Sequence, residues 1–153
     1  MKKQVVIGCD NAAVGLKETI SKFVEQLGYT VEDIGVGSSE DTTYYPLVAK
    51  KLCEILQASD FEKQGILICG TGIGMAMSAN KFKGIRAAVC HDIYSAERAK
   101  LSNNGNVLCM GARVIGPELA KKITQEWLSE EFKDGSSTPK VNAMKEIEAL
   151  NFK

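Results

Sequence analysis

Short apolar runs alternate along this chain with longer amphipathic stretches, and this alternation restricts the possible folds more than any other feature. Several runs lack the apolar–polar alternation of a half-exposed strand, as expected for strands that helices cover on both faces. The candidate strands are 4–9, 30–34, 65–69, 85–90 and 106–110. Strands joined by crossover helices build a parallel sheet. The pattern therefore predicts an α/β fold in which a five-stranded parallel sheet lies between two helical layers.

The amphipathic stretches carry helix signals. Between residues 15 and 27 the apolar side chains recur at helical spacing, and Gly28 follows as a stop. Pro46 and Pro117 stand where the first turn of a helix tolerates proline. The predicted helices are 15–27, 45–57, 73–80, 94–101, 117–128 and 139–150.

The last predicted helix is set off from the others by the polar, turn-rich stretch 132–138. With 153 residues the chain is long enough to bury a core of its own. We therefore expect a single domain over residues 1–153, made of a body (1–132) and a C-terminal arm (133–153). The arm is the segment that we expect to form a dimer with a partner subunit.

Composition excludes several classes of function. Lys plus Arg equals Asp plus Glu at 19 each, so no overall field attracts nucleic acid or an anionic membrane. The apolar run Val5–Cys9 is too short and too soon followed by Asp10 for a signal peptide, and no run reaches membrane-spanning length. Five cysteines without paired spacing favour reduced thiols and a cytoplasmic protein. One histidine and no Cys/His cluster predict no metal site.

In parallel sheets, ligands bind beyond the carboxyl ends of the strands. The richest such end is Cys69-Gly70-Thr71-Gly72-Ile73-Gly74, which we call the glycine turn and which leads from a strand into a helix. Free N–H groups and partial positive charge at the helix start can hold phosphate, carboxylate or a developing enediolate oxygen. They also favour thiolate over thiol at Cys69, a candidate general base or nucleophile, while Thr71 is suited to shuttle hydroxyl protons.

Other interpretations of the glycine turn stay open. Cys69 can be a small apolar strand residue, and the glycines a tight connection. Nicotinamide binding is disfavoured, because the spacing G-T-G-I-G departs from GxGxxG and no acidic residue stands at a convincing ribose-binding distance. Cys53 and Cys109 lie in apolar periodic segments and are expected in the core.

Two polar strand ends are further candidates. Asp10 follows the first strand and can orient substrate hydroxyls, although aspartate there is often a loop or cap residue. His91-Asp92 invites an acid/base role, but a strand-end histidine beside a helix-capping aspartate is the interpretation that we favour.

Several segments, in order along the chain, look like the type B ribose-5-phosphate isomerase family, which includes the two subunits of galactose-6-phosphate isomerase. These segments are Ile7-Gly8-Cys9-Asp10, Thr42-Thr43-Tyr44-Tyr45-Pro46, 65–75, Ala79-Asn80-Lys81, Gly84-Ile85-Arg86-Ala87, Tyr94-Ser95-Ala96, Asn106-Val107-Leu108 and Gly111-Ala112-Arg113. The resemblance covers most of the chain. It implies a three-layer αβα Rossmann-like sandwich, a homodimer or dimer of dimers, and active sites at the subunit interface with the C-terminal helix reaching the partner.

The resemblance also implies a sugar-phosphate substrate and no cofactor. Cys69 would take the proton from the carbon next to the carbonyl, and Thr71 would help to move a proton between the two substrate oxygens. N–H groups of Gly70, Gly72 and Gly74 would stabilise the enediolate. The family places further substrate contacts at Asp10, Asn103 and Arg113 of this sequence.

Four positions depart from the family pattern. Asn11 stands where these isomerases usually carry histidine, and Ser102 replaces the histidine credited with opening the sugar ring. Two phosphate-clamping arginines of the arm align with Ser136 and Lys140, so a bidentate clamp becomes one point charge at most.

The resemblance to type B ribose-5-phosphate isomerases makes ribose 5-phosphate the first choice of substrate, with ribulose 5-phosphate as the product. The departures leave two alternatives within the isomerases. One is a homo-oligomer acting on a sugar phosphate that needs no ring opening, and the other is the cysteine-bearing half of an enzyme whose homologous second subunit supplies the missing histidine and arginines. A rival of another class is a non-catalytic module that binds sugar phosphates.

Overall fold

The structure is a computed structural model that describes residues 3–152. Residues 1 and 2, and residue 153 at the end of the predicted arm, lie outside the described part. The strands are β1 (Gln4–Cys9), β2 (Thr30–Asp33), β3 (Gln64–Cys69), β4 (Ala87–Val89) and β5 (Val107–Gly111). The helices are α1 (Val14–Gln26), α2 (Tyr45–Ala58), α3 (Ile73–Ala79), α4 (Ile93–Leu101), α5 (Pro117–Ser129) and α6 (Thr138–Asn151).

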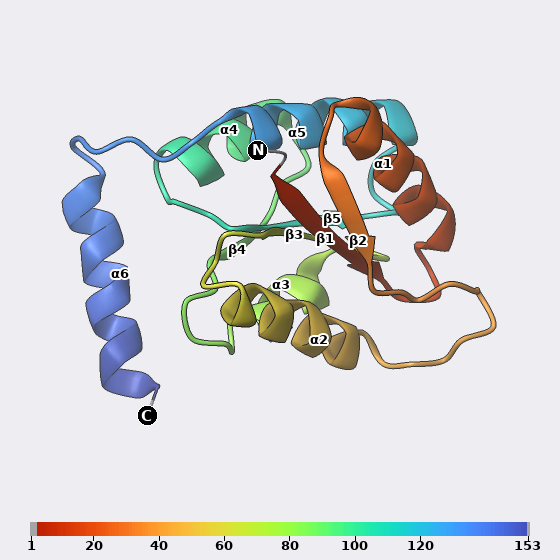
Figure 1. The fold of residues 1–153 in the computed structure, drawn as a ribbon, viewed down its shortest axis with the longest axis horizontal. Coiled ribbons are helices and arrows are strands. Elements are labelled where there is room, and N and C mark those ends of the chain that lie inside the picture. The colour runs from red at the N-terminus through yellow and green to blue at the C-terminus, as the bar shows by residue number, and fades with distance from the viewer. Residues whose placement is uncertain (1–2, 153) are drawn as a thin grey trace.

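The five strands form one sheet in the order β2-β1-β3-β5-β4, and every neighbouring pair is parallel. Helices α1, α4 and α5 cover one face, and α2 and α3 cover the other (Figure 1). Successive strand residues feed two separate cores, so that Ile66 and Ile68 pack toward α1 and α5 while Leu67 and Cys69 pack toward α2 and α3. The predicted three-layer αβα sandwich with a five-stranded parallel sheet is confirmed.

The fourth strand is shorter than the predicted 85–90. The Arg86 N–H donates to the side-chain oxygen of Asn106 at 2.7 Å, and the Asn106 N–H donates to the Arg86 carbonyl at 3.0 Å. An asparagine side chain therefore takes the place of a strand neighbour before pairing begins at Ala87. The same contact explains why β5 starts at Val107 rather than at Asn106.

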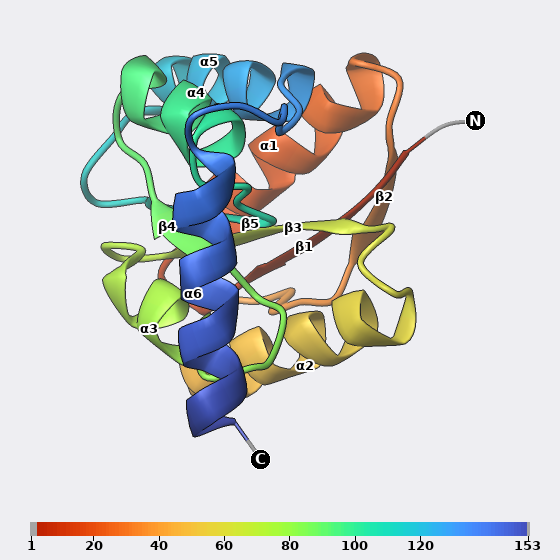
Figure 2. The same cartoon turned by 90° about the vertical axis from the view of Figure 1, so that its left-hand side faces the viewer.

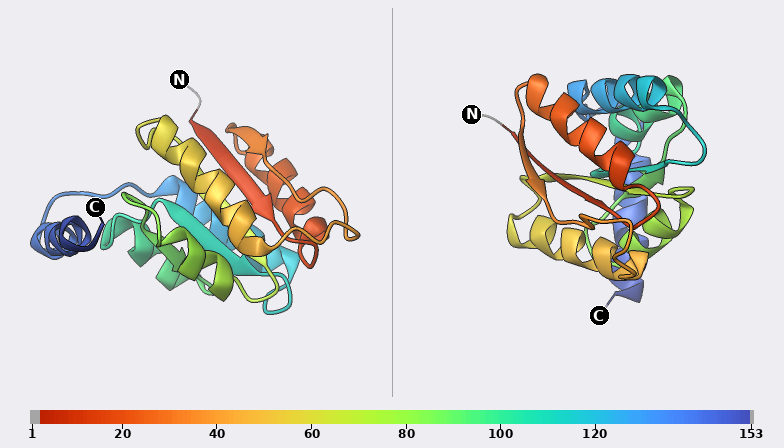
Figure 3. Two further views of the ribbon diagram at one scale, coloured as in Figure 1. Left: turned by 90° about the horizontal axis from the view of Figure 1, so that it is seen from below. Right: turned by 90° about the vertical axis from the view of Figure 1, so that its right-hand side faces the viewer.

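Helix α6 stands beside the β4 edge, outside the three layers (Figures 2 and 3). Val141 is 1% exposed, and a carboxylate oxygen of Glu148 accepts the Gly84 N–H at 3.0 Å, so both ends of the helix touch the body. Ile147 and Leu150 remain 61% and 80% exposed. The arm thus presents apolar side chains to solvent, and its contact with a partner subunit stays a prediction.

Among residues 3–152, no helix combines the length and the apolar character needed to cross a membrane. All five cysteines are free and buried. Burial raises the pKa of Cys9 and Cys90 to about 11 and that of Cys53 to about 12, and it raises the pKa of Cys109 well above its usual range. These four thiols are therefore protonated at neutral pH.

The buried thiols predict a loss of stability at alkaline pH. A thiol whose pKa is higher in the folded chain holds its proton there while the unfolded chain releases it, so stability present below pH 9 falls as the pH rises toward 11. Each such thiol costs about 1.4 kcal/mol per pH unit in that window. Lys100 acts in the opposite sense between pH 8 and 10.5, because burial lowers its pKa to about 8. Four thiols outweigh one amine, so the free energy of unfolding in urea should fall between pH 9 and 11.

A Cys53→Ala variant is the control. It starts less stable because it leaves a cavity, but its decline with pH should be shallower by about one thiol's contribution. An equal decline in both proteins would contradict the assignment of the pH dependence to buried thiols.

Candidate active site

Cys69 ends β3 at the carboxyl edge of the sheet and is 5% exposed. Its sulfur accepts the N–H of Gly72 at 3.1 Å. A donor held against the sulfur stabilises negative charge on it, as a thiolate base requires. Gly72 reaches this position with a φ of +79°, a backbone conformation that side chains disfavour.

The glycine turn lies directly on the end of β5. The Ala112 N–H donates to the Cys69 carbonyl at 2.8 Å, and the Arg113 N–H donates to the Gly70 carbonyl at 3.0 Å. A Cβ on Gly111 would come within 2.6 Å of the Thr71 Cα, so only glycine allows this approach. The glycines therefore do serve a tight connection, and that connection also fixes the positions of Cys69 and Thr71.

Where the glycine turn leads into α3, it is lined by hydrogen-bond donors and by an aromatic ring. Thr71 is exposed, and its Oγ1 accepts the Ile73 N–H at 3.3 Å. The N–H groups of Gly74 and Met75 belong to the first turn of α3, where no helical carbonyl can accept them. The hydroxyl of Tyr45 lies 2.8 Å from the place that a Cβ on Gly74 would occupy. These groups form a polar rim beside Cys69 that suits a negatively charged oxygen.

The neighbouring strand ends bring three more predicted residues to this edge. The Asp10 N–H donates to the Ile68 carbonyl at 3.3 Å, which places Asp10 next to Cys69, and Asn11 follows it with an exposed side chain. One Asp10 carboxylate oxygen accepts the Ala12 N–H at 3.0 Å, so Asp10 is a turn residue as well. The Arg113 guanidinium extends over Gly70, with Nη1 3.3 Å from the position of a Cβ there.

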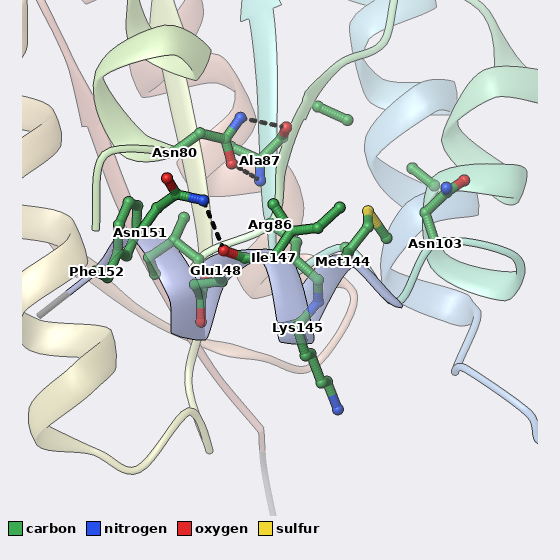
Figure 4. A pocket seen from close by; sticks show the side chains of 14 residues that line it. Asn80, Arg86, Ala87, Asn103, Met144, Lys145, Ile147, Glu148, Asn151 and Phe152 are labelled. Atoms are coloured by element: carbon green, nitrogen blue, oxygen red, sulfur yellow. Dashed lines mark hydrogen bonds between the residues drawn. The ribbon is translucent and has the colours of Figure 1, made fainter. Parts of the chain in front are cut away.

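Two predicted residues lie elsewhere. Asn103 precedes β5, so it lies at the amino edge of the parallel sheet, whereas Cys69 lies at the carboxyl edge. There it lines a cavity of about 480 Å³ between α6 and the body, together with Arg86, Met144 and Glu148 (Figure 4). Lys140 is exposed on α6. A single chain therefore does not bring Asn103 or Lys140 to the glycine turn, and their role stays a prediction.

His91 and Asp92 have structural contacts. The Nε2 atom of His91 accepts the Gly111 N–H at 2.9 Å, so this histidine supports the strand end beneath Thr71. Asp92 caps α4 by accepting the backbone N–H and the hydroxyl of Ser95 at 2.6 and 2.7 Å, and these bonds lower the pKa of Asp92. The capping interpretation of this pair is therefore confirmed.

Sequence reasoning missed one residue beside the site, Tyr45, and one buried cation near the end of β2, Lys17. Tyr45 was placed at a helix start and within a segment that resembles the family, and neither indicates that its ring packs on Gly74. Lys17 falls on the polar side of the predicted first helix, yet it is 2% exposed. Its ammonium contacts Asp33 at 2.8 Å and the Val36 carbonyl at 3.0 Å. Both contacts join segments far apart in the sequence, which periodicity does not reveal.

One group of carboxylates has the spacing of metal ligands, formed by Glu97, Glu126 and Glu130. These residues lie on or next to α4 and α5, whereas the Cys69 side chain points to the opposite face of the sheet. Glu97 is already paired with Arg98 at 2.8 Å. The group has no contact with the glycine turn.

Comparisons with known proteins identify the family. The model described as Ribose/Galactose Isomerase matches residues 5–144. The chain belongs to this family. A relative from Pectobacterium atrosepticum named D-erythrulose-4-phosphate isomerase is 51% identical over 90% of both chains. Ribose-5-phosphate isomerase B of Escherichia coli is 41% identical over 95% of this chain and 97% of its own. The solved ribose-5-phosphate isomerase B of Clostridium thermocellum superposes with a TM-score of 0.91 at 38% identity, covering 96% of this chain and 98% of that one.

The family resemblance seen in the sequence is thereby confirmed, and the protein is an aldose–ketose isomerase of sugar phosphates. The comparisons therefore favour an isomerase over the rival expectation that this chain is a non-catalytic module binding sugar phosphates. The relatives carry different substrate names, so the sugar itself is a separate question.

Proposed function

We propose that this isomerase interconverts D-erythrulose 4-phosphate and D-erythrose 4-phosphate. The observation that carries the proposal is Ser102, at the position where ribose isomerases of the family carry the ring-opening histidine. A four-carbon aldose phosphorylated on O4 has no hydroxyl left to close a five-membered ring. It therefore reaches the enzyme as an open chain and needs no acid to open it. The name of the relative that is 51% identical supports the same substrate.

The proposed chemistry is a proton transfer through a cis-enediolate. The Cys69 thiolate removes a proton from the hydroxyl-bearing carbon next to the carbonyl, and the electron pair moves onto the carbonyl oxygen. Thr71 passes the hydroxyl proton between the two substrate oxygens. Cys69 then returns its proton to the neighbouring carbon, so no atom is gained or lost. N–H groups of the glycine turn hold the oxyanion where charge develops.

We assign the binding of the sugar hydroxyls and the phosphate to residues around the glycine turn. Asp10 and Asn11 accept and donate hydrogen bonds to sugar hydroxyls, and Arg113 provides positive charge beside Gly70. Asn103 and Lys140 reach the turn only from a second chain, so we propose a homodimeric site. One lysine in place of an arginine pair holds phosphate by charge alone and does not fix its orientation. A small substrate tolerates this because it can bind in few orientations.

Ribose 5-phosphate remains the second candidate, since relatives that are 44% and 41% identical bear that name. It exists mostly as a closed ring, and this chain offers serine where an acid is needed. We expect the kcat/KM for D-erythrulose 4-phosphate to exceed that for ribose 5-phosphate by at least about 100-fold, the lower end of what one positioned acid or base contributes.

The substrate test measures initial rates by proton NMR for the purified chain. With ribose 5-phosphate, the rate should stop rising as enzyme is added, because spontaneous ring opening becomes limiting. With D-erythrulose 4-phosphate it should stay proportional to enzyme. Equal or faster turnover of ribose 5-phosphate, proportional to enzyme throughout, would overturn the proposal. Activity that arises only on adding a homologous chain would favour the two-subunit alternative, and no turnover of any sugar phosphate would favour the binding module.

A further inference from the structure

We propose that Arg98 and Ser102 form a hydrogen-bonded pair that adapts the site to open-chain sugar phosphates. The inference rests on the proposed function and deepens it. The two residues stand one turn apart at the end of α4, and Nη1 of Arg98 donates to the Ser102 Oγ at 3.3 Å. Ser102 is the position at which the family's ring-opening histidine is missing. Arg98 thus contacts one of the four positions at which this chain departs from the family pattern.

Arg98 also fixes the backbone that carries the pair. Its carbonyl accepts the N–H of Ser102 at 2.8 Å and the N–H of Asn103 at 3.2 Å. Through its carbonyl and its guanidinium, one residue therefore holds both Ser102 and Asn103. Asn103 is exposed and is one of the positions at which the family resemblance places a substrate contact, which it reaches only from a second chain in the proposed homodimer.

The guanidinium is not arranged to clamp phosphate. Its Nε and Nη2 atoms both contact a Glu97 carboxylate oxygen, at 3.0 and 2.8 Å, and its Cζ atom lies 5.9 Å from the centre of the Tyr94 ring. A bidentate phosphate contact would need that occupied edge. Only Nη1 faces away from Glu97, and it points to Ser102. Arg98 is therefore a positioning residue, which acts through Ser102.

The hydrogen-bond inventory then fixes what Ser102 can do. A hydroxyl has one proton to donate and lone pairs that accept, and the Arg98 contact uses a lone pair. Within residues 3–152 the Ser102 O–H has no acceptor among the hydrogen bonds of the structure. In the homodimeric site proposed above, this O–H is left to donate to an oxygen of the substrate bound at the partner's glycine turn. A neutral hydroxyl can hold the oxygen of an open chain, but it is too weak an acid to protonate a ring oxygen at neutral pH.

A double-mutant cycle tests the pair. The variants are Arg98→Met, Ser102→Ala, the double variant, and Arg98→Lys, with Lys122→Met on the exposed side of α5 as a control that removes a comparable charge. The readouts are kcat/KM for D-erythrulose 4-phosphate, the Kd for 4-phospho-D-erythronate by calorimetry, and the thermal midpoint. The acid is an open-chain, four-carbon phosphate, and its binding is measurable whether or not the chain turns over.

Arg98→Met and Ser102→Ala should each lower kcat/KM by about 10- to 100-fold. The kcat/KM of the double variant should be no lower than that of the less active single variant. The Kd should follow the same pattern, Arg98→Lys should recover part of the loss, and Lys122→Met should match the wild type. The proposed pair would be refuted if the loss in the double variant equalled the product of the two single losses. An Arg98→Met protein with the kcat/KM and Kd of the wild type would refute it too. Coupled losses in Kd without turnover of D-erythrulose 4-phosphate would support the pair and refute the proposed function instead.

Discussion

A Cys69→Ser protein should lose about 100- to 10,000-fold in kcat while binding 4-phospho-D-erythronate within about 3-fold of the wild type. The reason is that a positioned base contributes about 100- to 10,000-fold, and a serine hydroxyl does not ionise where a thiol does. Serine preserves the size of the side chain at this 5% exposed position. The Gly72 N–H can still donate to its oxygen, so the turn should stay folded. Stopped-time NMR assays and calorimetry measure the two quantities separately.

Cys90→Ala provides the matched control. Cys90 is also buried at a strand end, but burial raises its pKa to about 11, so it holds its proton and cannot serve as a base at neutral pH. The variant should unfold about 1–3 kcal/mol more easily because it leaves a small cavity, and it should keep its kcat. If Cys69→Ser kept wild-type turnover, or if Cys90→Ala lost turnover without unfolding, the assignment of the base would be wrong.

The parts of the fold that were predictable are those whose residues are buried on both faces. The first strand was placed at 4–9 and the third at 65–69, and the structure has Gln4–Cys9 and Gln64–Cys69. Their side chains fill two cores at once, and no polar position interrupts the apolar run. The strand at the sheet edge was predicted too long. Its start is set by the Asn106 side chain, a contact across twenty residues that periodicity does not encode.

The site divides in the same way. The rule that ligands meet parallel strands at their carboxyl ends was enough to group Asp10, Cys69 and Arg113, because β1, β3 and β5 are neighbours in the sheet. It does not reveal that Tyr45 covers Gly74, since that contact depends on where a long exposed loop returns. Nor can a single chain account for the predicted substrate contact of Asn103, because this residue faces the arm at the other edge of the sheet.

The substrate was the least predictable part. The family resemblance alone favoured ribose 5-phosphate, whereas the relatives of this chain carry the names of more than one sugar substrate. The proposed preference for a four-carbon sugar rests on one substituted side chain, Ser102, and on the contact that Arg98 makes with it. In this proposal, substrate choice depends on residues that lie, within one chain, far from the atoms that move the proton.

The second large effect is expected from Gly111→Ala, a substitution that adds a single methyl group to the end of β5. The new Cβ would lie 2.6 Å from the Thr71 Cα, 2.7 Å from its carbonyl carbon and 2.8 Å from the Gly70 oxygen. All three are backbone atoms, so no rotamer change can relieve the overlap. The turn must move by roughly 1 Å to restore ordinary contact distances, and a displacement of that size at reacting groups costs about 100-fold in rate. We expect kcat to fall by that factor and stability by about 1–3 kcal/mol.

Gly116→Ala separates this effect from a general intolerance of side chains. A Cβ on Gly116 meets nothing within 4 Å, and its φ of −83° is open to any residue, so its kcat should be unchanged and its stability should drop by less than about 1 kcal/mol. The His91 contact supplies an internal check, because the Gly111 N–H that His91 accepts at 2.9 Å must move with the turn. The chemical shift of the His91 ring nitrogen should therefore change in Gly111→Ala and not in Gly116→Ala. A Gly111→Ala protein with normal kcat and an unshifted His91 signal would mean that Thr71 and Cys69 need not be held against β5 for catalysis.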